Sequence, residues 1–275
     1  MTDGAAEIGF ACREGITRLT RLYQRDPLRV LFPAPAAGDP LLAVLVTTSG
    51  GLVAGDRLDI GVRLAKGAVA HVTASAAEKV YRSLGPTTRI RQSLSVAAGA
   101  ALEFRPLETI MFDGARLWRE TTIELESGAG FLGGDIVVLG RRARGERFIG
   151  GFLREVWQVR RAGRLVWGDA LHVEGDVAGM IDDPACFDRA AAFATMILAP
   201  AEQDPRRLLD CARTIQSASA TAAVRSGVTA IAGLVVARWL AADAAALRKA
   251  YANLASHLRR EAMGLPPVLS RLWHV

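Results

Sequence analysis

Cysteine and histidine are scarce in this sequence, which has three cysteines and four histidines among its 275 residues. Cys12, Cys186 and Cys211 lie far apart and form no CxxC or Cys/His spacing. This pattern excludes a disulfide framework and a structural zinc site as the basis of the fold. Unpaired cysteines suit a reducing compartment, so we expect a cytoplasmic protein.

Long hydrophobic segments are also missing. The most apolar stretch, VTAIAGLVVA, ends at Arg238, well short of the roughly 18 apolar residues that a membrane span needs. The N-terminus carries Asp3 and Glu7 before its first basic residue, Arg13, and has no apolar core typical of a secretion signal. We therefore expect no membrane partner.

Aromatic residues are few, at 6% of the chain, and the charge is nearly balanced, with 34 basic and 28 acidic residues. The densest basic segment, GRRARGERFIGG at residues 140–151, has Phe148 as its one aromatic residue. RNA-binding segments usually interleave basic and aromatic residues, because bases stack on the rings. The sequence thus argues against a nucleic-acid partner and leaves two interpretations of this segment: a solvated loop or a surface for an anionic partner.

What the sequence does have is a period-two alternation of apolar and polar residues between about residues 41 and 175. Gly67, Gly99 and Gly128 recur about 30 residues apart, each between two apolar segments, as expected for the positive-φ corner of a repeating strand-turn-strand unit. We predict a mainly β protein of stacked short strands. The predicted strands span 58–64, 69–74, 89–96, 101–105, 117–125, 153–160 and 165–173.

The composition becomes alanine-rich after about residue 182, where the sequence predicts two helices. Asp204 followed by Pro205 is typical of a helix start and opens a helix that runs to about residue 219. The second helix lies in ADAAALRKAYANLASHLRREAMG and ends at Gly264. Its apolar face is formed by Leu247, Tyr251, Leu254 and Leu258.

Two further apolar stretches, residues 192–199 and 227–239, fit either a buried strand or a helix, and their β-branched residues and flanking glycines favour strands. We interpret the chain as a single domain, residues 1–275. It has a β-rich body at about 15–180 and a mixed strand and helix part at about 182–275.

The segment TTSGGLVAGDRLDI at residues 47–60 places Asp56 directly after a glycine-rich stretch. A phosphate-binding loop is excluded, because a strand follows rather than a helix with a Lys-Ser/Thr pair. Asp56 either caps the amides of a tight turn or faces an interior channel together with Asp135 of GFLGGDIVVLG, which we predict to be a second corner between strands. Carboxylates in such a channel would hold a divalent cation briefly.

The sequence has no catalytic motif such as G-x-S-x-G or H-E-x-x-H, and its histidines are isolated. An alternative function is a β-helical carbohydrate-active enzyme that uses Asp56 and Asp135 as acid and base, with the arginine-rich segment binding an acidic glycan. Such an enzyme would show aromatic platforms for the sugar rings, and aromatic residues are few here. A nucleic-acid-binding module would rest on charge alone.

Five segments resemble, in their order along the chain, motifs of the UreD family of urease accessory proteins, called UreH in some organisms. They are GITRLTRLYQRDPLRVLFP, SGGLVAGDRL, SAAEKVYRS, GRRARGERF and GLPPVLSRLWHV. RPLETIMFDGA departs from the proline-rich pattern of the family at that point and keeps only Pro106, Ile110 and Phe112. Residues matching the motifs, with binding roles implied, are Lys79, Tyr81, Arg141, Glu146, Arg271 and Trp273.

The resemblance implies a two-layered β-helical or sandwich-like body with two C-terminal α-helices that acts as a scaffold and not as an enzyme. It implies binding to apo-urease and to UreF, with the GTPase UreG recruited through UreF. Nickel would pass in transit, with no tightly bound cofactor, along an internal path near Asp56 and Asp135. The scarcity of thiols and imidazoles fits this role, because those ligands would trap Ni²⁺. The alanine-rich C-terminal third and Trp273 are expected to form a partner surface.

Overall fold

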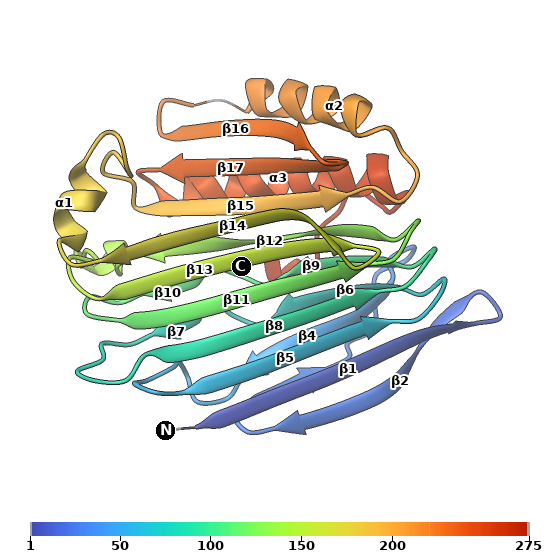
Figure 1. The fold of residues 1–275 in the computed structure, drawn as a ribbon, viewed down its shortest axis with the longest axis horizontal. Coiled ribbons are helices and arrows are strands. Elements are labelled where there is room, and N and C mark those ends of the chain that lie inside the picture. The colour runs from blue at the N-terminus through green and yellow to red at the C-terminus, as the bar shows by residue number, and fades with distance from the viewer. Residues whose placement is uncertain (1, 220, 274–275) are drawn as a thin grey trace.

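The computed structural model describes residues 2–219 and 221–273, whose strands form two sheets packed face to face (Figure 1). The front sheet of Figure 1 contains, in spatial order, β14 (Arg164–Glu174), β13 (Phe152–Arg161), β11 (Arg116–Leu125), β8 (Thr88–Val96), β5 (Arg57–Leu64), β1 (Asp3–Arg13) and β2 (Ile16–Arg25). The back sheet contains β16 (Val224–Ile231), β17 (Leu234–Ala241), β15 (Ala192–Ala199), β12 (Gly130–Leu139), β9 (Ala101–Arg105), β6 (Val69–Ala74), β4 (Leu41–Thr47) and β3 (Leu28–Leu31). Short strands β7 (Glu78–Val80) and β10 (Thr109–Met111) pair with each other, and β10 also pairs with β12.

The middle of the molecule is a stack of coils, because the chain alternates between the two sheets and adjacent strands run parallel. Strands β5, β8, β11 and β13 are parallel neighbours in front, and β6, β9 and β12 are parallel neighbours behind. Gly67, Gly99 and Gly128 make the turns from front to back with φ of 71°, 67° and 73°, a region that favours glycine. The predicted repeat and the mainly β, solenoid-like body are confirmed.

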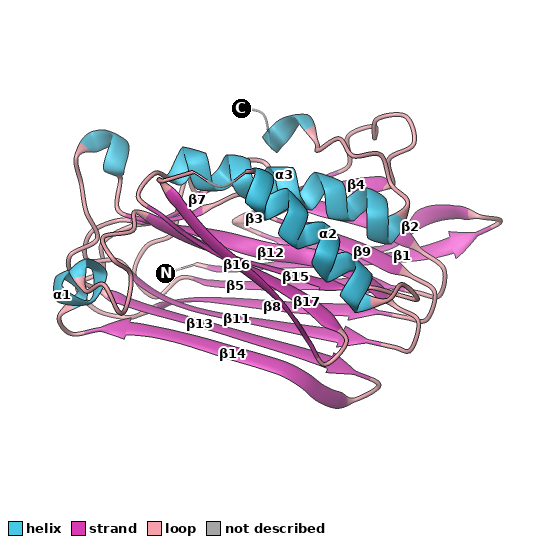
Figure 2. Ribbon diagram, turned by 90° about the horizontal axis from the view of Figure 1, so that it is seen from above, coloured by secondary structure: helices cyan, strands magenta, loops and turns pink. Residues whose placement is uncertain are grey.

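The main core lies between the sheets, where alternate residues of each front strand point inward. In β8 the burial pattern alternates strictly, with Ile90 and Leu94 inside and Arg89 and Arg91 outside. In the back sheet, helices also pack on the far side, over β12, β15, β16 and β17 (Figure 2). Its central strand β12 is buried at every position.

The helices of the C-terminal part have the bounds α1 (Val177–Asp182), α2 (Pro205–Ala218) and α3 (Ala244–Met263), with single turns η1 (Arg142–Arg144) and η2 (Arg271–Trp273). The two predicted C-terminal helices are confirmed: the carboxylate of Asp204 caps α2, and Gly264 ends α3 with φ of 64°. The predicted apolar stripe of α3 is buried against the back sheet. Both ambiguous stretches are strands, β15 and the hairpin β16–β17, and they extend the back sheet beyond the coils.

The N-terminal part of the fold differs from the prediction. The β body begins at Asp3, because β1 and β2 form a hairpin whose β1 pairs parallel with β5. The alternation is hidden there, since β2 is an edge strand exposed along nearly its whole length.

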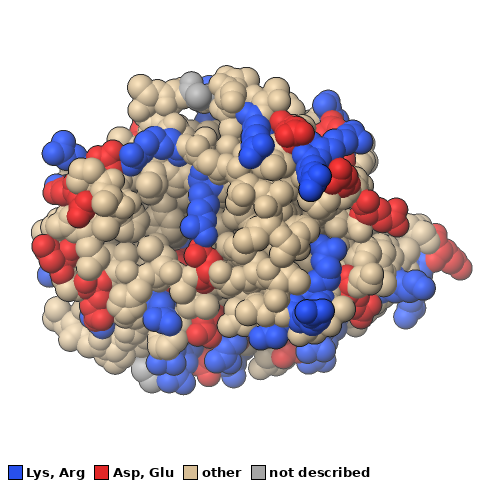
Figure 3. Space-filling model, turned by 45° about the horizontal axis from the view of Figure 1, so that its top comes forward, with Lys and Arg blue, Asp and Glu red and all other residues tan. Residues whose placement is uncertain are grey.

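Charged side chains of both signs are interspersed over the face shown in Figure 3. None of the helices in the described ranges combines the length and apolarity needed to cross a lipid bilayer.

The prediction of a corner at Gly133–Asp135 is wrong. These residues lie inside β12, where all three pair with β15 and Gly133 also pairs with β9. The glycines allow close packing and make no turn: a Cβ atom on Gly134 would lie 2.8 Å from Cα of Met196, and one on Gly133 would press on the ring of Phe131. Because these glycines have no side chain, the neighbouring strands pack closely beside Asp135.

Candidate functional site

Three charged side chains meet in the interior between the two sheets. Arg119 of β11 and Glu155 of β13 are adjacent in register in the front sheet, and Asp135 reaches them from β12 behind. Nη2 of Arg119 donates to Oε2 of Glu155 at 2.9 Å and lies 3.3 Å from Oδ2 of Asp135. All three residues are at most 4% exposed, so this is a charge cluster inside the core. We call it the interior cluster.

The carboxylates of the interior cluster keep free lone pairs. Within the described residues, both oxygens of Asp135 and Oε1 of Glu155 accept no hydrogen bond, although Oδ2 and Oε1 lie 3.3 and 2.9 Å from Nη2 of Arg119 as ion-pair contacts. Nη1 of Arg119 donates instead to Oγ1 of Thr109 at 2.8 Å, on the other side of the guanidinium. Buried carboxylate oxygens without donors are costly, and they are ligands that a divalent cation accepts.

Burial also changes the acidities of the interior cluster. Loss of solvent raises the pKa of Asp135, and it raises that of Glu155 to about 7, although the nearby Arg119 acts in the opposite direction. Burial disfavours the charge on Arg119, but attraction to Asp135 and Glu155 outweighs it and raises the pKa of the guanidinium. The arginine is therefore held charged, whereas burial favours the neutral form of both acids.

A cavity of about 550 Å³ lies on one side of the interior cluster. Asp135, Glu155 and Trp157 line its inner part, and its outer part runs between β14 and the extension of the back sheet. Asp169 of β14 and Arg238 of β17 face each other there, with Oδ2 and Nη2 2.6 Å apart. Arg225 and Gly227 are also exposed in this lining, so the cavity opens to solvent.

A second cavity, of about 130 Å³, lies on the other side. Arg119 and Thr109 line it together with Glu78, whose Oε2 accepts a hydrogen bond from Thr47 at 2.5 Å. Its lining also includes exposed residues, among them Lys79 and Gly50. Because Arg119 lines this cavity and contacts two acids that line the first, the interior cluster stands between two cavities that reach different surfaces.

Several motif residues meet at the end of the coil stack, beside the smaller cavity. The hydroxyl of Tyr81 donates to the carbonyl of Gly50 at 3.1 Å, and its ring packs edge-on against Phe112 with centroids 4.7 Å apart. The guanidinium of Arg141 lies 4.3 Å from the Phe112 ring centre and pairs with Glu146. Segments up to 96 residues apart in sequence, from Gly50 to Glu146, thus build one surface.

Asp56 has a different environment from Asp135. Its Oδ1 accepts a hydrogen bond from the amide of Thr2 at 2.6 Å, its Oδ2 accepts one from Val53 at 2.9 Å, and the residue is 1% exposed. Both carboxylate oxygens are therefore used to fix the turn before β5. Asp56 lines neither of the two cavities, and the structure does not bring it to Asp135.

The other predicted residues divide between surface and core. Lys79 and Arg271 are exposed. Trp273 is 5% exposed, so the expectation that it forms part of a partner surface is wrong. Its ring stacks on Tyr251 of α3 with centroids 5.6 Å apart and an angle of 6°. Trp273 therefore belongs to the core between α3 and the back sheet.

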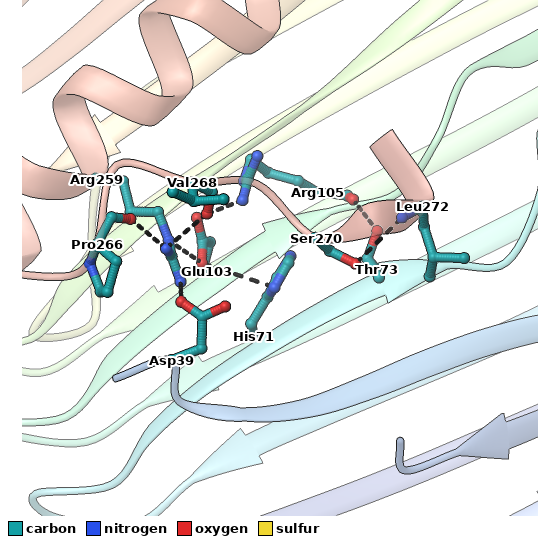
Figure 4. A network of polar contacts seen from close by, with 10 residues as sticks. All are labelled: Asp39, His71, Thr73, Glu103, Arg105, Arg259, Pro266, Val268, Ser270 and Leu272. Carbon is teal, nitrogen blue, oxygen red and sulfur yellow. Dashed lines mark hydrogen bonds and ion pairs between the residues drawn. The ribbon is translucent and has the colours of Figure 1, made fainter. Parts of the chain in front are cut away.

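A second buried charge network lies under the C-terminal segment (Figure 4). Glu103 of β9 accepts from Arg105 at 2.5 Å and from Nε of Arg259 at 3.0 Å. Arg259 also bonds Asp39 at 2.7 Å and the carbonyls of Pro266 and Val268. This network fastens the segment after α3 to the β body.

The acidities in this network follow from burial and pairing. Burial alone would raise the pKa of Glu103, but attraction to Arg105, His71 and Arg259 lowers it to about 2. Burial lowers the pKa of His71 to about 4, against the attraction of Glu103 3.8 Å away. His71 is thus a neutral core residue, and the network serves stability.

Sequence reasoning missed Arg119 and Glu155, although each is a charged residue on a mostly apolar strand face. In β11 the inward residues include Leu117 and Ile123, with Arg119 between them. In the parts of the chain that the structure describes, no group of three or more His, Cys, Asp or Glu side chains is arranged to hold a metal ion. The interior cluster offers two carboxylates.

Comparisons with known proteins agree along the whole length of the chain. The family model for the UreD urease accessory protein matches residues 2–274. A urease accessory protein UreD of Magnetococcus marinus is 41% identical over 275 residues, covering 99% of this chain and 94% of that protein. Proteins of the same name from Rhodopseudomonas palustris (strain BisA53) and Methylobacterium sp. (strain 4-46) are 38% and 40% identical over 261 residues, which cover 94% of this chain and 86% and 89% of theirs. The chain therefore belongs to the UreD family of urease accessory proteins, which act in urease maturation and are not enzymes.

Proposed function

We propose that this protein is a scaffold of urease maturation through whose interior nickel passes on its way to the urease active site. The observation that carries the proposal is the position of Asp135 and Glu155. They are buried, they have carboxylate oxygens without hydrogen-bond donors, and they lie between two cavities that reach the surface. An ion that enters either cavity meets these oxygens before it can leave by the other.

The ligand chemistry suits an ion in transit. Thiolates and imidazoles bind Ni²⁺ strongly, whereas a pair of carboxylates completed by water binds it weakly. The interior cluster has the two carboxylates, and Glu78 in the smaller cavity is a third acid along the same route. We place nickel on Asp135 and Glu155, and we assign Asp56 to the turn because both of its oxygens already accept backbone hydrogen bonds.

The partners in this proposal are apo-urease and UreF, with UreG joining through UreF. One candidate docking surface is the end of the coil stack, where successive loops are hydrogen-bonded to each other. The amide of Ser83 donates to the carbonyl of Gly114 at 3.0 Å, and the amide of Gly114 donates to the carbonyl of Gly150 at 2.8 Å. These loops expose large apolar residues, with Leu84 95% exposed and Ile149 53% exposed. Exposed apolar groups of this kind favour a protein partner, and the smaller cavity opens beside them. The three free thiols fit a cytoplasmic site of action.

The test measures nickel in urease purified from cells that express the urease subunits, the accessory proteins and one variant. Asp135→Asn and Glu155→Gln keep the side-chain shape but remove the charge, and we expect a several-fold drop in nickel per urease. Asp59→Asn, on the exposed face of β5, is the matched control and should load urease normally. Copurification of each variant with UreF and apo-urease tests the scaffold role separately from the nickel route.

If Asp135→Asn and Glu155→Gln both load urease normally, the interior route is rejected and the scaffold role stays. If urease reaches full nickel content in cells that lack the protein, both parts are rejected.

A further inference from the structure

We propose that Arg119 is the internal counter-ion of the nickel route: its guanidinium occupies the cation position on Asp135 and Glu155 and is displaced when a divalent ion passes. This inference rests on the proposed function and adds to it a residue that controls how tightly the ion is held. It follows from the contacts of Arg119, from its place between the cavities and from the way its side chain is held.

The contacts show that a cation position already exists and is filled. One nitrogen, Nη2, lies within 3.3 Å of oxygens from both Asp135 and Glu155. In the described ranges, the ion pairs of these two acids are all with Arg119. A divalent ion bound by the same oxygens would lie close to the guanidinium, and two cations at that distance repel each other strongly in a buried site. The ion and the guanidinium therefore compete for the two acids.

The position of Arg119 makes this competition unavoidable for an ion that crosses the molecule. Arg119 is 3% exposed, lines the smaller cavity, and contacts the acids that line the larger one. An ion in the smaller cavity therefore reaches the guanidinium before it reaches Asp135. Arg119 thus separates the two halves of the route.

The Arg119 side chain also has an alternative acidic partner, Glu78. Glu78 lines the same small cavity as Arg119, and attraction between the two contributes to the pKa of each. Nε of Arg119 has no hydrogen-bond partner among the described residues, and the guanidinium is held through its two terminal nitrogens. A rotation toward Glu78 would exchange one acidic partner for another and free Asp135 and Glu155.

This arrangement explains how a buried pair of acids can release a metal. Without a counter-ion, two buried carboxylates would gain greatly from a divalent ion and would hold it. With Arg119 available to return, the energy of the empty site is lowered, and the ion is bound less tightly than the acids alone would bind it. The guanidinium keeps its positive charge at any physiological pH, so Arg119 itself can return to the acids without taking up a proton.

The experiment measures Ni²⁺ binding to the purified full-length protein by equilibrium dialysis against NiCl₂, and Ni²⁺ release by a chelator chase. Arg119→Met removes the charge at similar length. We expect it to bind Ni²⁺ at least 10-fold more tightly and to release it at least 10-fold more slowly than the wild type. Arg119→Lys keeps a positive charge and should show no such gain. Adding Asp135→Asn to Arg119→Met should abolish the gain, because one of the two ligands is then neutral.

Circular dichroism and thermal melting establish that each variant is folded. If Arg119→Met does not fold, Arg119→Gln removes the same charge while it can still hydrogen-bond Thr109. A folded neutral variant that binds and releases Ni²⁺ like the wild type overturns the counter-ion role. This result is separate from the fate of the route itself, which fails if Asp135→Asn and Glu155→Gln load urease normally. If those two variants load poorly and the neutral arginine variant shows unchanged affinity, only the counter-ion inference is lost.

Discussion

Arg119 of β11 and Asp135 of β12 join the two sheets across the interior, with Nη2 and Oδ2 3.3 Å apart. Most other inward positions of these strands are apolar and pack into one continuous core. An ion pair buried in such a core contributes little net stability, because desolvation offsets the attraction. The interior cluster is therefore better explained by a role in binding an ion than by a contribution to the stability of the fold.

The close packing around Asp135 depends on Gly134. A methyl group at this position would overlap the carbonyl oxygen of Thr195 and lie 2.8 Å from Cα of Met196, both in the neighbouring strand β15. We expect Gly134→Ala to lower the free energy of unfolding by about 1 to 3 kcal/mol, the usual cost of overpacking. Gly227→Ala, in the exposed strand β16 with open space around the added carbon, is the control and should change it little. Urea denaturation measures both, and equal stabilities would contradict the packing role of Gly134.

Asp56 should act in the fold and not on the nickel route. Asp56→Ala removes two partly buried hydrogen bonds, from the amides of Thr2 and Val53 to a carboxylate, so we expect a loss of about 1 to 3 kcal/mol in the free energy of unfolding. Nickel delivered to urease, divided by the amount of folded protein, should match the wild type. A variant of normal stability that delivers less nickel would show that the carboxylate serves the route after all.

Arg259 should be among the most sensitive positions for stability. It bonds Glu103, Asp39 and two carbonyls while only 1% exposed. Arg259→Met leaves the carboxylate of Glu103 with one arginine partner fewer, and removing one partner of a buried pair typically costs about 3 to 5 kcal/mol. The adjacent Arg260 has a half-exposed side chain and contacts Glu261 on the surface, so Arg260→Met should cost less than about 0.5 kcal/mol. Thermal melting of the two variants provides the comparison, and similar melting temperatures would refute it.

The buried His71 should make stability depend on pH. Its pKa is lowered from 6.5 to about 4 in the folded protein, so between these values the unfolded chain binds a proton that the folded chain does not. Stability is therefore lost as the pH falls from 6.5 to 4, and the 2.5-unit difference corresponds to about 3 kcal/mol in total. Glu103 acts at lower pH, because its own stabilising contribution is lost between 4.5 and about 2.

The measurement compares urea denaturation at pH 7 and pH 4.5 for the wild type and His71→Leu. The comparison isolates His71, because the raised pKa of Glu155 changes stability in the opposite direction over the same range. We expect the variant to lose less stability than the wild type on acidification, and His172→Ala, at an exposed position, to keep the wild-type dependence. An unchanged dependence in His71→Leu would show that His71 is not neutral in the folded state.

Local sequence pattern predicted those parts of the fold that depend on local rules. The glycine corners at 67, 99 and 128, the alternating strands between them, and the caps of α2 and α3 all depend on the backbone preferences of a few neighbouring residues. The hairpin β1–β2 was missed because an exposed edge strand shows no alternation. The Gly-Gly of β12 was misplaced because glycine serves both turns and close packing.

The candidate site was predicted less completely, for a physical reason. Asp135 stood out through its glycine neighbours, but its partners are 16 and 20 residues away in sequence, at Arg119 and Glu155, and reach it only when the sheets stack. A charged residue on the apolar phase of a strand is the signal that marks them. Trp273 was misjudged for a related reason, since its ring is covered by Tyr251, and only the packing of α3 shows it.

The network in Figure 4 also bears on how the chain matures during synthesis. Glu103 lies in the early coils beside Arg105, and Arg259, its second arginine partner, follows 156 residues later. N-terminal segments fold first as a chain leaves the ribosome, so the coils assemble around an acid that still lacks one of its two arginine partners. We therefore expect α3 and the segment after it to dock last. A prematurely terminated polypeptide would leave Glu103 incompletely paired in the middle of the stack, far from the point where translation stopped.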